Sequence, residues 1–344
     1  MQGPAVVSMG GLKVAAQTKL NLATDRNKRL RLRNQVILFA AYIALFLLAN
    51  ILTGGRFFSS TNIMATFSHA VYPGLAAFGM CFIFTPGIVD LSLGATILLS
   101  ANIGAVLATD AGLGYVGLIL GCILSAIVLE TITIQVGLRL RIPSWIAGLG
   151  MTLVYEAILS LYAAYRSADT GNPYVRLTDD LRVFGQMPGI VVLWLIGFVL
   201  CYFLYSRSIL GINIRALGCN ENVAQAMGIN KNKTIFWGTI VGAAFIGAAA
   251  LARVSYNGFL VSSSGMGSVS SIFRSLATFL LAQSFASYIG VPLGALLGAL
   301  LVAGLFNFLT LMGVPSGTGQ EICLGAIVVI CGVISNIKNK GVVK

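Results

Sequence analysis

The chain is poor in charged residues and in histidine, and both shortages exclude classes of protein. Only 9% of its 344 residues are charged, whereas 57% are hydrophobic. A soluble domain of this length would have too little polar surface to cover itself. His69 is the single histidine, so a zinc site built from several histidines is excluded. The composition therefore predicts an integral membrane protein.

Several catalytic motifs are missing as well. The sequence has no GxxxxGK[ST] phosphate loop, no HExxH and no GxSxG. A GxGxxG match at Gly112, Gly114 and Gly117 lies in a turn between two apolar runs, without the strand that a dinucleotide site requires. We therefore expect no cofactor and no covalent chemistry from this chain, and any ATP chemistry must come from a partner.

The positions of lysine and arginine predict the topology. Cations crowd the N-terminal tail, 1–34, at Lys13, Lys19, Arg26, Lys28, Arg29, Arg31 and Arg33, and the C-terminal tail, 338–344, at Lys338, Lys340 and Lys344. The positive-inside bias places both tails in the cytosol, so the number of crossings is even. Although the net charge is +12, its cations lie beside apolar runs, and nucleic-acid binding is not expected.

About ten apolar runs are long enough to cross a bilayer. They lie near 35–52, 66–87, 90–109, 115–138, 145–165, 187–206, 234–254, 271–289, 291–312 and 320–337. Together they define a transmembrane domain over 35–337. This count places the loop 207–233 in the cytosol and the loop 166–186 outside.

A polar island at 206–233 interrupts these runs. Asn220 can cap a short helix, Glu221 in its first turn suits the helix dipole, and Gly228 suits a left-handed stop. A membrane protein rarely keeps such a segment without a partner. The island therefore predicts a short helix that faces the cytosol.

Two stretches are expected to contain broken or re-entrant helices. Pro73, Pro86 and Gly87 fall within 61–90, and a segment that reads SSSGMGS falls within 255–290. Irregular backbone at membrane depth persists only where protein or a watery cavity satisfies its polar groups. Both stretches are therefore candidates for lining a solute pathway.

Rare charges at membrane depth or at its edge are further candidates. They are Asp90, Glu130, Glu156, Arg253, Arg274 and Glu321. Charges are costly in lipid, so each is a candidate site by default. Glu130 and Arg253 lie near predicted helix ends, where snorkelling or interfacial pairing is the favoured interpretation. Asp90, which Ser92 follows, could cap the next helix or face the pathway, and capping is slightly favoured.

The island also carries an ordered set of residues at Gly211, Arg215, Ala216, Gly218, Asn220, Glu221, Ala224, Gly228 and Ile229. This order resembles the coupling loop of sugar-type ABC importer permeases of the ribose permease family. In that family the loop docks on the ATP-binding subunit. The resemblance implies that the exposed side chains of the short helix fill a groove on the ATPase. It implies ATPase-coupling roles for Arg215, Gly218, Asn220, Glu221, Ala224 and Gly228.

Other segments extend the resemblance over roughly residues 40–335. The segment 87–94 reads GIVDLSLG and looks like the family's GGIDLSVG signature, and 142–151, which includes Trp145, is similar to IPPFI-x-TLGM. Asn307, Gln320 and the GAI run at 325–327 also fall where related permeases carry matching residues. Asp90, Ser92, Trp145 and Asn307 are therefore pathway or structural candidates.

The resemblance implies an all-α permease of about ten spans in the cell membrane, similar in fold to the vitamin B12 type of ABC importer. It implies a dimer of identical or different permeases, ATP-binding subunits on the cytosolic face and an extracytoplasmic solute-binding protein. The expected solute is a monosaccharide or a related polyol, and nucleosides and furanone signals are near alternatives.

One segment departs from the family pattern. Between Gly265 and Gly290, relatives usually carry an acidic residue, an IAA triplet and a GG pair, whereas Arg274 stands near the usual acid here. Glu156 likewise stands where relatives often have arginine. These changes indicate altered pathway electrostatics or partner contacts, so Arg274 joins the candidates, and they fit one half of an unequal pair of permeases.

Two other functional classes remain open. An ion-coupled secondary transporter would also need about ten spans, broken helices and a few buried charges, but it does not explain the predicted helix at 220–228. A receptor or scaffold without transport would explain the apolar runs but not the breaks within them.

Overall fold

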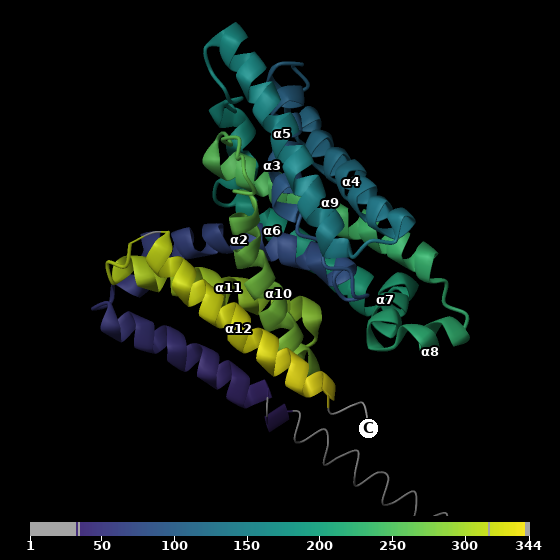
Figure 1. The fold of residues 1–344 in the computed structure, drawn as a ribbon. Coiled ribbons are helices and arrows are strands. Elements are labelled where there is room, and N and C mark those ends of the chain that lie inside the picture. Colours follow the sequence, from purple (N-terminus) through teal and green to yellow (C-terminus); the bar gives the residue numbers. More distant parts are fainter. Residues whose placement is uncertain (1–31, 34, 316, 341–344) are drawn as a thin grey trace, which may run out of the picture.

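The computed structural model describes residues 32–33, 35–315 and 317–340. Within these residues the chain folds into helices and contains no strand (Figure 1). The all-α prediction is therefore confirmed. The two basic tails fall almost wholly outside the described residues, so their position in the cytosol stays a prediction.

The long helices follow one another with short connections. In chain order the elements are a first helix Gln35–Leu52, η1 Arg56–Phe58, α2 Ser60–Ile83, α3 Leu93–Thr109, α4 Gly114–Leu140, α5 Ser144–Thr170, η2 Asp179–Gly185, α6 Gly189–Ser206, α7 Ile209–Cys219, α8 Glu221–Ala226, α9 Lys231–Asn257, α10 Val269–Ile289, α11 Val291–Leu311 and α12 Thr318–Lys340.

Each of the ten expected spans coincides with one of these helices. Eight of the described helices are long and apolar enough to cross a membrane. The other two expected spans, 90–109 and 320–337, fall on α3 and α12, whose apolar stretches are shorter. The chain is therefore a multi-pass membrane protein.

Helices α2 and α9 form the centre of the bundle. They pack against each other, with α3, α4 and α5 on one side and α10, α11 and α12 on the other (Figure 1). In the most apolar 18-residue segment of α2, 78% of the residues are buried, compared with 6% in the first helix. Small residues allow the central contact, because a Cβ added to Gly79 would lie 2.6 Å from the Gly242 carbonyl oxygen.

The first expected break lies later in the chain than Pro73. Helix α2 runs through Pro73 without ending and stops at Ile83. The chain then turns through Pro86 and Gly87, whose φ of 91° is left-handed, before α3 begins. A proline inside a helix removes one donor, whereas a left-handed residue ends the helix outright. The interruption therefore falls at 84–92.

The polar island lies at one end of the bundle. Figure 1 shows α7 and α8 at the lower right, on the same side as the end of α12, whereas the loop after α5 lies on the far side. The placement of this side of the bundle in the cytosol stays a prediction.

Candidate functional site

The two helix breaks meet inside the bundle. Gly94, in the first turn of α3, packs so closely on the segment before α10 that an added Cβ would lie 2.3 Å from the Ser268 carbonyl oxygen. Both α3 and α10 therefore begin at the same place, next to each other. Broken helices that meet in this way are typical of the solute sites of membrane transporters.

The break before α3 is held largely by nearby side chains. The backbone N–H of Ser92 donates to Asp90 Oδ1 at 2.7 Å, and the N–H of Val89 donates to Ser144 Oγ at 3.1 Å. The Thr152 hydroxyl donates to the Leu91 carbonyl at 3.2 Å. Asp90 thus accepts the N–H of Ser92, the N-cap residue of α3, in a local turn; this satisfies a free donor at the helix start, although no side chain caps the first turn of α3 itself.

The break before α10 is held by a carboxylate from another helix. Glu156 on α5 is 2% exposed and accepts the backbone N–H groups of Met266, at 2.9 Å, and Ser268, at 2.7 Å. These two bonds use both carboxylate oxygens and satisfy orphan donors at the start of α10. Sequence reasoning interpreted Glu156 as a charge change in the pathway and missed this contact.

A polar cavity of about 500 Å³ lies beside the break before α10. Its lining is Leu98, Arg253, Asn257, Phe259, Leu260, Val261, Ser262, Ser263, Gly267, Ser268, Ser270 and Ser271. Hydroxyl, amide and guanidinium groups therefore share the wall with apolar side chains, a mixture typical of sites for small polar solutes. The expected re-entrant stretch does line a cavity.

Arg253 takes part in this wall. Its guanidinium carbon lies 4.8 Å from the centre of the Tyr72 ring, and its Nη1 donates to the Tyr72 hydroxyl at 3.4 Å. That hydroxyl donates in turn to the Ser271 carbonyl at 3.0 Å. The cation-π contact and these bonds tie α9, α2 and α10 together, so Arg253 acts inside the bundle.

A second polar cavity, of about 210 Å³, contains two of the expected candidates. Arg274 and Asn307 line it together with His69 and Gln320. Asn307 donates to the Asn62 carbonyl at 3.4 Å and also to the Thr66 hydroxyl, and Arg274 lies over the Phe306 ring at 4.3 Å. The structure therefore brings Arg274 and Asn307 together, although they are far apart in the sequence.

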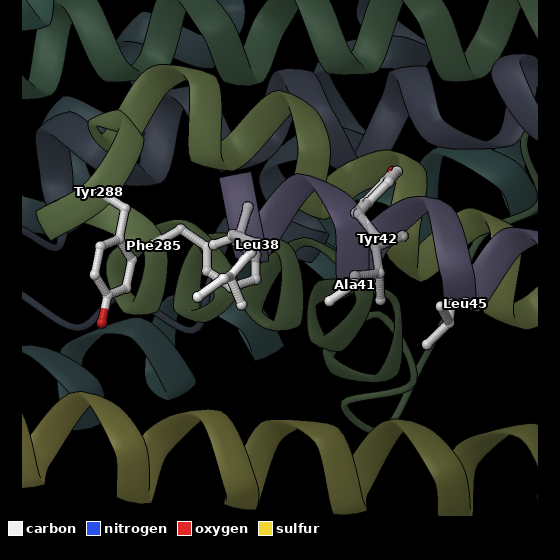
Figure 2. A pocket seen from close by; sticks show the side chains of 8 residues that line it. Leu38, Ala41, Tyr42, Leu45, Phe285 and Tyr288 are labelled. Carbon is white, nitrogen blue, oxygen red and sulfur yellow. The ribbon is translucent and has the colours of Figure 1, made fainter. Parts of the chain in front are cut away.

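An apolar cavity of about 450 Å³ separates the first helix from α10 and α11 (Figure 2). Ile37, Leu38, Ala41, Tyr42, Leu45, Phe285, Tyr288 and Leu301 line it. Tyr42 uses its hydroxyl to donate to the Leu297 carbonyl at 3.1 Å. The lining offers a polar solute almost no partners, so this cavity is not a candidate pathway.

Glu130 does not lie at a helix edge as expected. It sits in the middle of α4, fully buried beside Asp90. Ser92 is also buried there, and its hydroxyl donates to the Thr133 hydroxyl at 3.5 Å. The sequence placed Glu130 close to a predicted helix end, where snorkelling was expected. That interpretation is wrong, because α3 packs on the face of α4 that carries Glu130.

Helix α8 forms at the predicted place, with the predicted Asn220 cap and the predicted left-handed stop at Gly228. Asn220 Oδ1 accepts the Val223 N–H at 3.1 Å, and Gly228 adopts a left-handed φ of 88°. Glu221 forms an ion pair with Lys231 at 2.7 Å, which closes the loop onto the start of α9. The short helix is thus a rigid turn whose ends are both fixed.

Ala224 differs from the expectation of an exposed coupling residue. It is 2% exposed, whereas Val223 and Met227 on the same helix are 54% and 79% exposed. Ala224 therefore supports α8 from inside, and the apolar side chains open to a partner are those of Val223 and Met227. An exposed apolar pair on a polar loop is a typical docking feature.

Two other residues expected to take part in coupling, Arg215 and Gly218, pack against neighbouring segments of the bundle. Arg215 on α7 stacks over the Tyr205 ring at 5.5 Å, and an added Cβ on Gly218 would lie 2.2 Å from the Thr85 carbonyl oxygen. Gly218 thus packs α7 against the start of the break at 84–92. Trp145, by contrast, is half exposed at the start of α5 and belongs to neither polar cavity.

Comparison with known proteins agrees with this arrangement. The family described as "branched-chain amino acid transport system / permease component" matches residues 62–332. The chain is 26% identical over 299 residues to the ribose import permease protein RbsC of Escherichia coli K12, covering 83% of this chain and 88% of the relative. It is 25% identical over 311 residues to RbsC of Bacillus subtilis 168, covering 86% and 92%. It is 24% identical over 364 residues to the xylose transport system permease protein XylH of E. coli K12, covering 86% and 89%.

Proposed function

The chain belongs to the family of permease components of branched-chain amino acid transport systems, and from this premise we propose that it forms the solute pathway of an ATP-driven importer. It is a multi-pass permease of the cell membrane. The observation that carries the proposal is the irregular segment between α9 and α10, which lines a polar cavity of about 500 Å³ inside a helical bundle.

The proposed solute is a monosaccharide. The relatives named above are ribose and xylose permeases. The serine hydroxyls at 262, 263, 270 and 271 and the Asn257 amide can exchange hydrogen bonds with sugar hydroxyls, and Phe259 adds an apolar ring face. Asp90, Ser92, Arg274 and Asn307 stay candidates for the wider pathway.

Coupling is proposed to run through α8. The cytosolic loop 207–233 would dock on an ATP-binding subunit through Val223 and Met227, while Asn220, Glu221 and Gly228 keep the helix rigid. Arg215 and Gly218 would pass the movement to the core. ATP hydrolysis would take place in that subunit, and the permease itself would be no enzyme.

Further partners follow from the same proposal. A solute-binding protein would deliver the sugar to the extracytoplasmic face, which includes the loop 166–186. A second permease, identical or different, would complete the pathway within the lipid bilayer. If the second permease differs, this chain purified alone should form few functional complexes with the ATPase.

Uptake into vesicles tests the transport proposal. Vesicles that contain the permease, its ATPase and its binding protein should accumulate radiolabelled ribose or xylose only when ATP is supplied. Uptake that needs no ATPase but follows an imposed ion gradient would contradict the proposal and support the ion-coupled alternative.

Matched methionine variants test the coupling helix. Met227→Ser should insert normally but lose co-purification of the ATPase, because it removes the most exposed apolar contact of α8. Met312→Ser makes the same change at a residue that is 51% exposed after α11, on the predicted outer face, and should leave the complex intact. Equal ATPase recovery with both variants would contradict the assignment of α8.

A further inference from the structure

Two carboxyl groups are buried together between α3 and α4. Asp90 is 1% exposed and Glu130 is fully buried. Their side chains lie within hydrogen-bonding reach of each other, and the Thr96 hydroxyl lies beside Glu130. Neither residue lines the 500 Å³ cavity or belongs to the coupling helix.

The pair is short of hydrogen-bond donors. Asp90 Oδ1 accepts the Ser92 N–H, but Asp90 Oδ2 and both oxygens of Glu130 have no donor among the described residues. Thr96, which is fully buried, also makes no hydrogen bond with its hydroxyl. Orphan polar atoms in a helical membrane core are unusual, and several at one place indicate a missing ligand.

The groups around the pair supply no positive charge. The neighbours are hydroxyls: Ser92 and Thr96 at the start of α3, Thr133 on α4 and Tyr155 on α5. Thr133 and Tyr155 already donate to the Leu129 carbonyl, at 3.1 Å and 2.7 Å. The ion pairs of the described residues, Arg166–Asp110, Arg182–Asp179 and Lys231–Glu221, all lie elsewhere. Two ionised carboxylates here would repel each other in a medium of low dielectric.

We propose that Asp90 and Glu130 form a proton-binding site that holds a single proton between them. A hydronium ion gives its proton to one carboxylate and leaves as water, so that one O–H bond breaks and one forms, and the resulting acid donates to the other carboxylate. The pair then carries one negative charge. The Thr96 hydroxyl can donate to the remaining oxygen of Glu130, which satisfies the last free hydroxyl of the cluster.

The proton has a route to this site. A cavity of about 150 Å³ is lined by Ile88, Asp90, Thr133, Ile134, Gly137, Leu138, Ile142 and Ser144, and it has room for several waters. Its lining reaches the last turn of α4 and the first residue of α5, next to Arg139 and Arg141, on the predicted cytosolic side. Asp90 lines the cavity and Glu130 does not, so the proton enters by way of Asp90.

The site is mechanically connected to the other helix break. Asp90 fixes the start of α3, and Gly94 in the next turn packs on Ser268 before α10. A bound proton holds α3 against α4, whereas its loss would leave two like charges that push them apart. The protonation state therefore acts on the wall of the 500 Å³ cavity through the start of α3.

Infrared spectroscopy of the full permease in lipid nanodiscs tests the site directly. The wild-type protein should show the C=O stretching band of a buried carboxylic acid, shifted by exchange into D2O. Glu130→Gln should remove this band, because the amide donates to Asp90 in place of the acid. Glu321→Gln makes the same change at an exposed position and should leave the band unchanged.

The pH dependence of thermal unfolding gives a second readout. A proton bound only in the folded state stabilises the protein at low pH, and this stabilisation is lost as the pH rises. Between about pH 4, where a carboxyl of the unfolded chain loses its proton, and the pH at which the folded pair loses its own, the wild-type unfolding temperature should fall by roughly 2–4 °C per pH unit. Above that pH it should level off, and the whole dependence should be weaker in Glu130→Gln.

Three outcomes would overturn the proposal. The first is a wild-type protein without a protonated-acid band. The second is a band that survives in both Glu130→Gln and Asp90→Asn, where the second variant keeps the acceptor for Ser92 and guards against misfolding of the first. The third is stabilisation by sodium chloride but not by choline chloride at equal ionic strength, which would assign the pair to a metal cation.

Discussion

The two helix breaks differ in which side chain accepts the free backbone N–H groups at the helix start. Before α3, the acceptor for the free N–H group is Asp90, two residues away from its donor Ser92. Before α10, the acceptor is Glu156, which lies 110 and 112 residues away from its donors Met266 and Ser268. Helix α5 contributes to both breaks, through Ser144 and Thr152 at the first and Glu156 at the second, but only the first break also has a local acceptor for the N–H group at its helix start.

This difference has a consequence for stability and for transport. A local acceptor holds its helix start wherever that helix moves. A remote acceptor holds α10 in place only while α5 stays where it is, so movement of α5 would release the segment that lines the larger cavity. The break before α10 is therefore the better placed of the two to change during a transport cycle.

The largest effect is expected for Glu156→Ala. Removal of the carboxylate leaves the buried N–H group of Ser268 and the part-buried N–H group of Met266 without an acceptor. Each costs about 1–3 kcal/mol, so we expect a loss of about 3 kcal/mol. Thermal unfolding in detergent should report it as a large fall in the unfolding temperature.

Ser160→Ala is the matched control for that variant. Ser160 lies one turn further along α5, and its hydroxyl donates to the Ser263 carbonyl at only 3.4 Å, so its loss should change stability by about 1 kcal/mol at most. Comparable stability of Glu156→Ala and wild type would show that the remote carboxylate does not hold the break.

A smaller effect is expected where the two breaks touch. In Gly94→Ala the new methyl group would clash with the Ser268 carbonyl, and overpacking of this kind destabilises by about 1–3 kcal/mol. Gly150→Ala is the control, because Gly150 lies inside α5 with open space around it and should gain slightly from the better helix propensity of alanine. Similar unfolding temperatures for both variants would mean that the breaks are not in tight contact.

Sequence reasoning succeeded where the signal is local. The apolar runs located the helices of all ten expected spans, and Asn220 and Gly228 located α8, whereas the cap role of Asp90 stays a prediction because Ser92 is the N-cap residue of α3. Each of these depends on residues within a few positions of one another. Hydrophobic runs, caps and left-handed stops have physical causes that act over one or two helical turns.

The same reasoning failed where contacts join distant segments. Glu156 gives no local sign that it faces Met266, and Glu130 gives none that α3 covers it. The resemblance assigned Ala224 a role in coupling to the ATPase through exposed side chains of the short helix, yet Ala224 is buried. Tyr72 and Arg253 were likewise not connected, because their contact depends on how α2 packs against α9.

Two amide variants compare the local hydrogen bond that Asp90 accepts before α3 with the remote hydrogen bonds that Glu156 accepts before α10. Asp90→Asn keeps one side-chain oxygen to accept the Ser92 N–H, so its helix start should weaken by less than about 1 kcal/mol. Glu156→Gln keeps one acceptor where two are needed and turns an NH2 group toward a backbone N–H, so it should lose about 1–2 kcal/mol. Chemical denaturation or thermal unfolding of both variants, measured side by side, checks this order. Its reversal would mean that the Asp90 charge matters more than its cap.

The smallest effect concerns the turn that Glu156 holds. Met266 adopts a left-handed φ of 64°, which costs a residue other than glycine about 1 kcal/mol, so Met266→Gly should relieve that strain while keeping the N–H that Glu156 accepts. We expect a gain of about 0.5 kcal/mol after some loss of packing. Gly265→Ala is the opposite test at the adjacent left-handed residue, with φ 65° and open space around it, and it should destabilise by about 1 kcal/mol. If both variants lowered stability equally, backbone strain would not set the shape of this turn, and the bonds from Met266 and Ser268 to Glu156 would have to fix it alone.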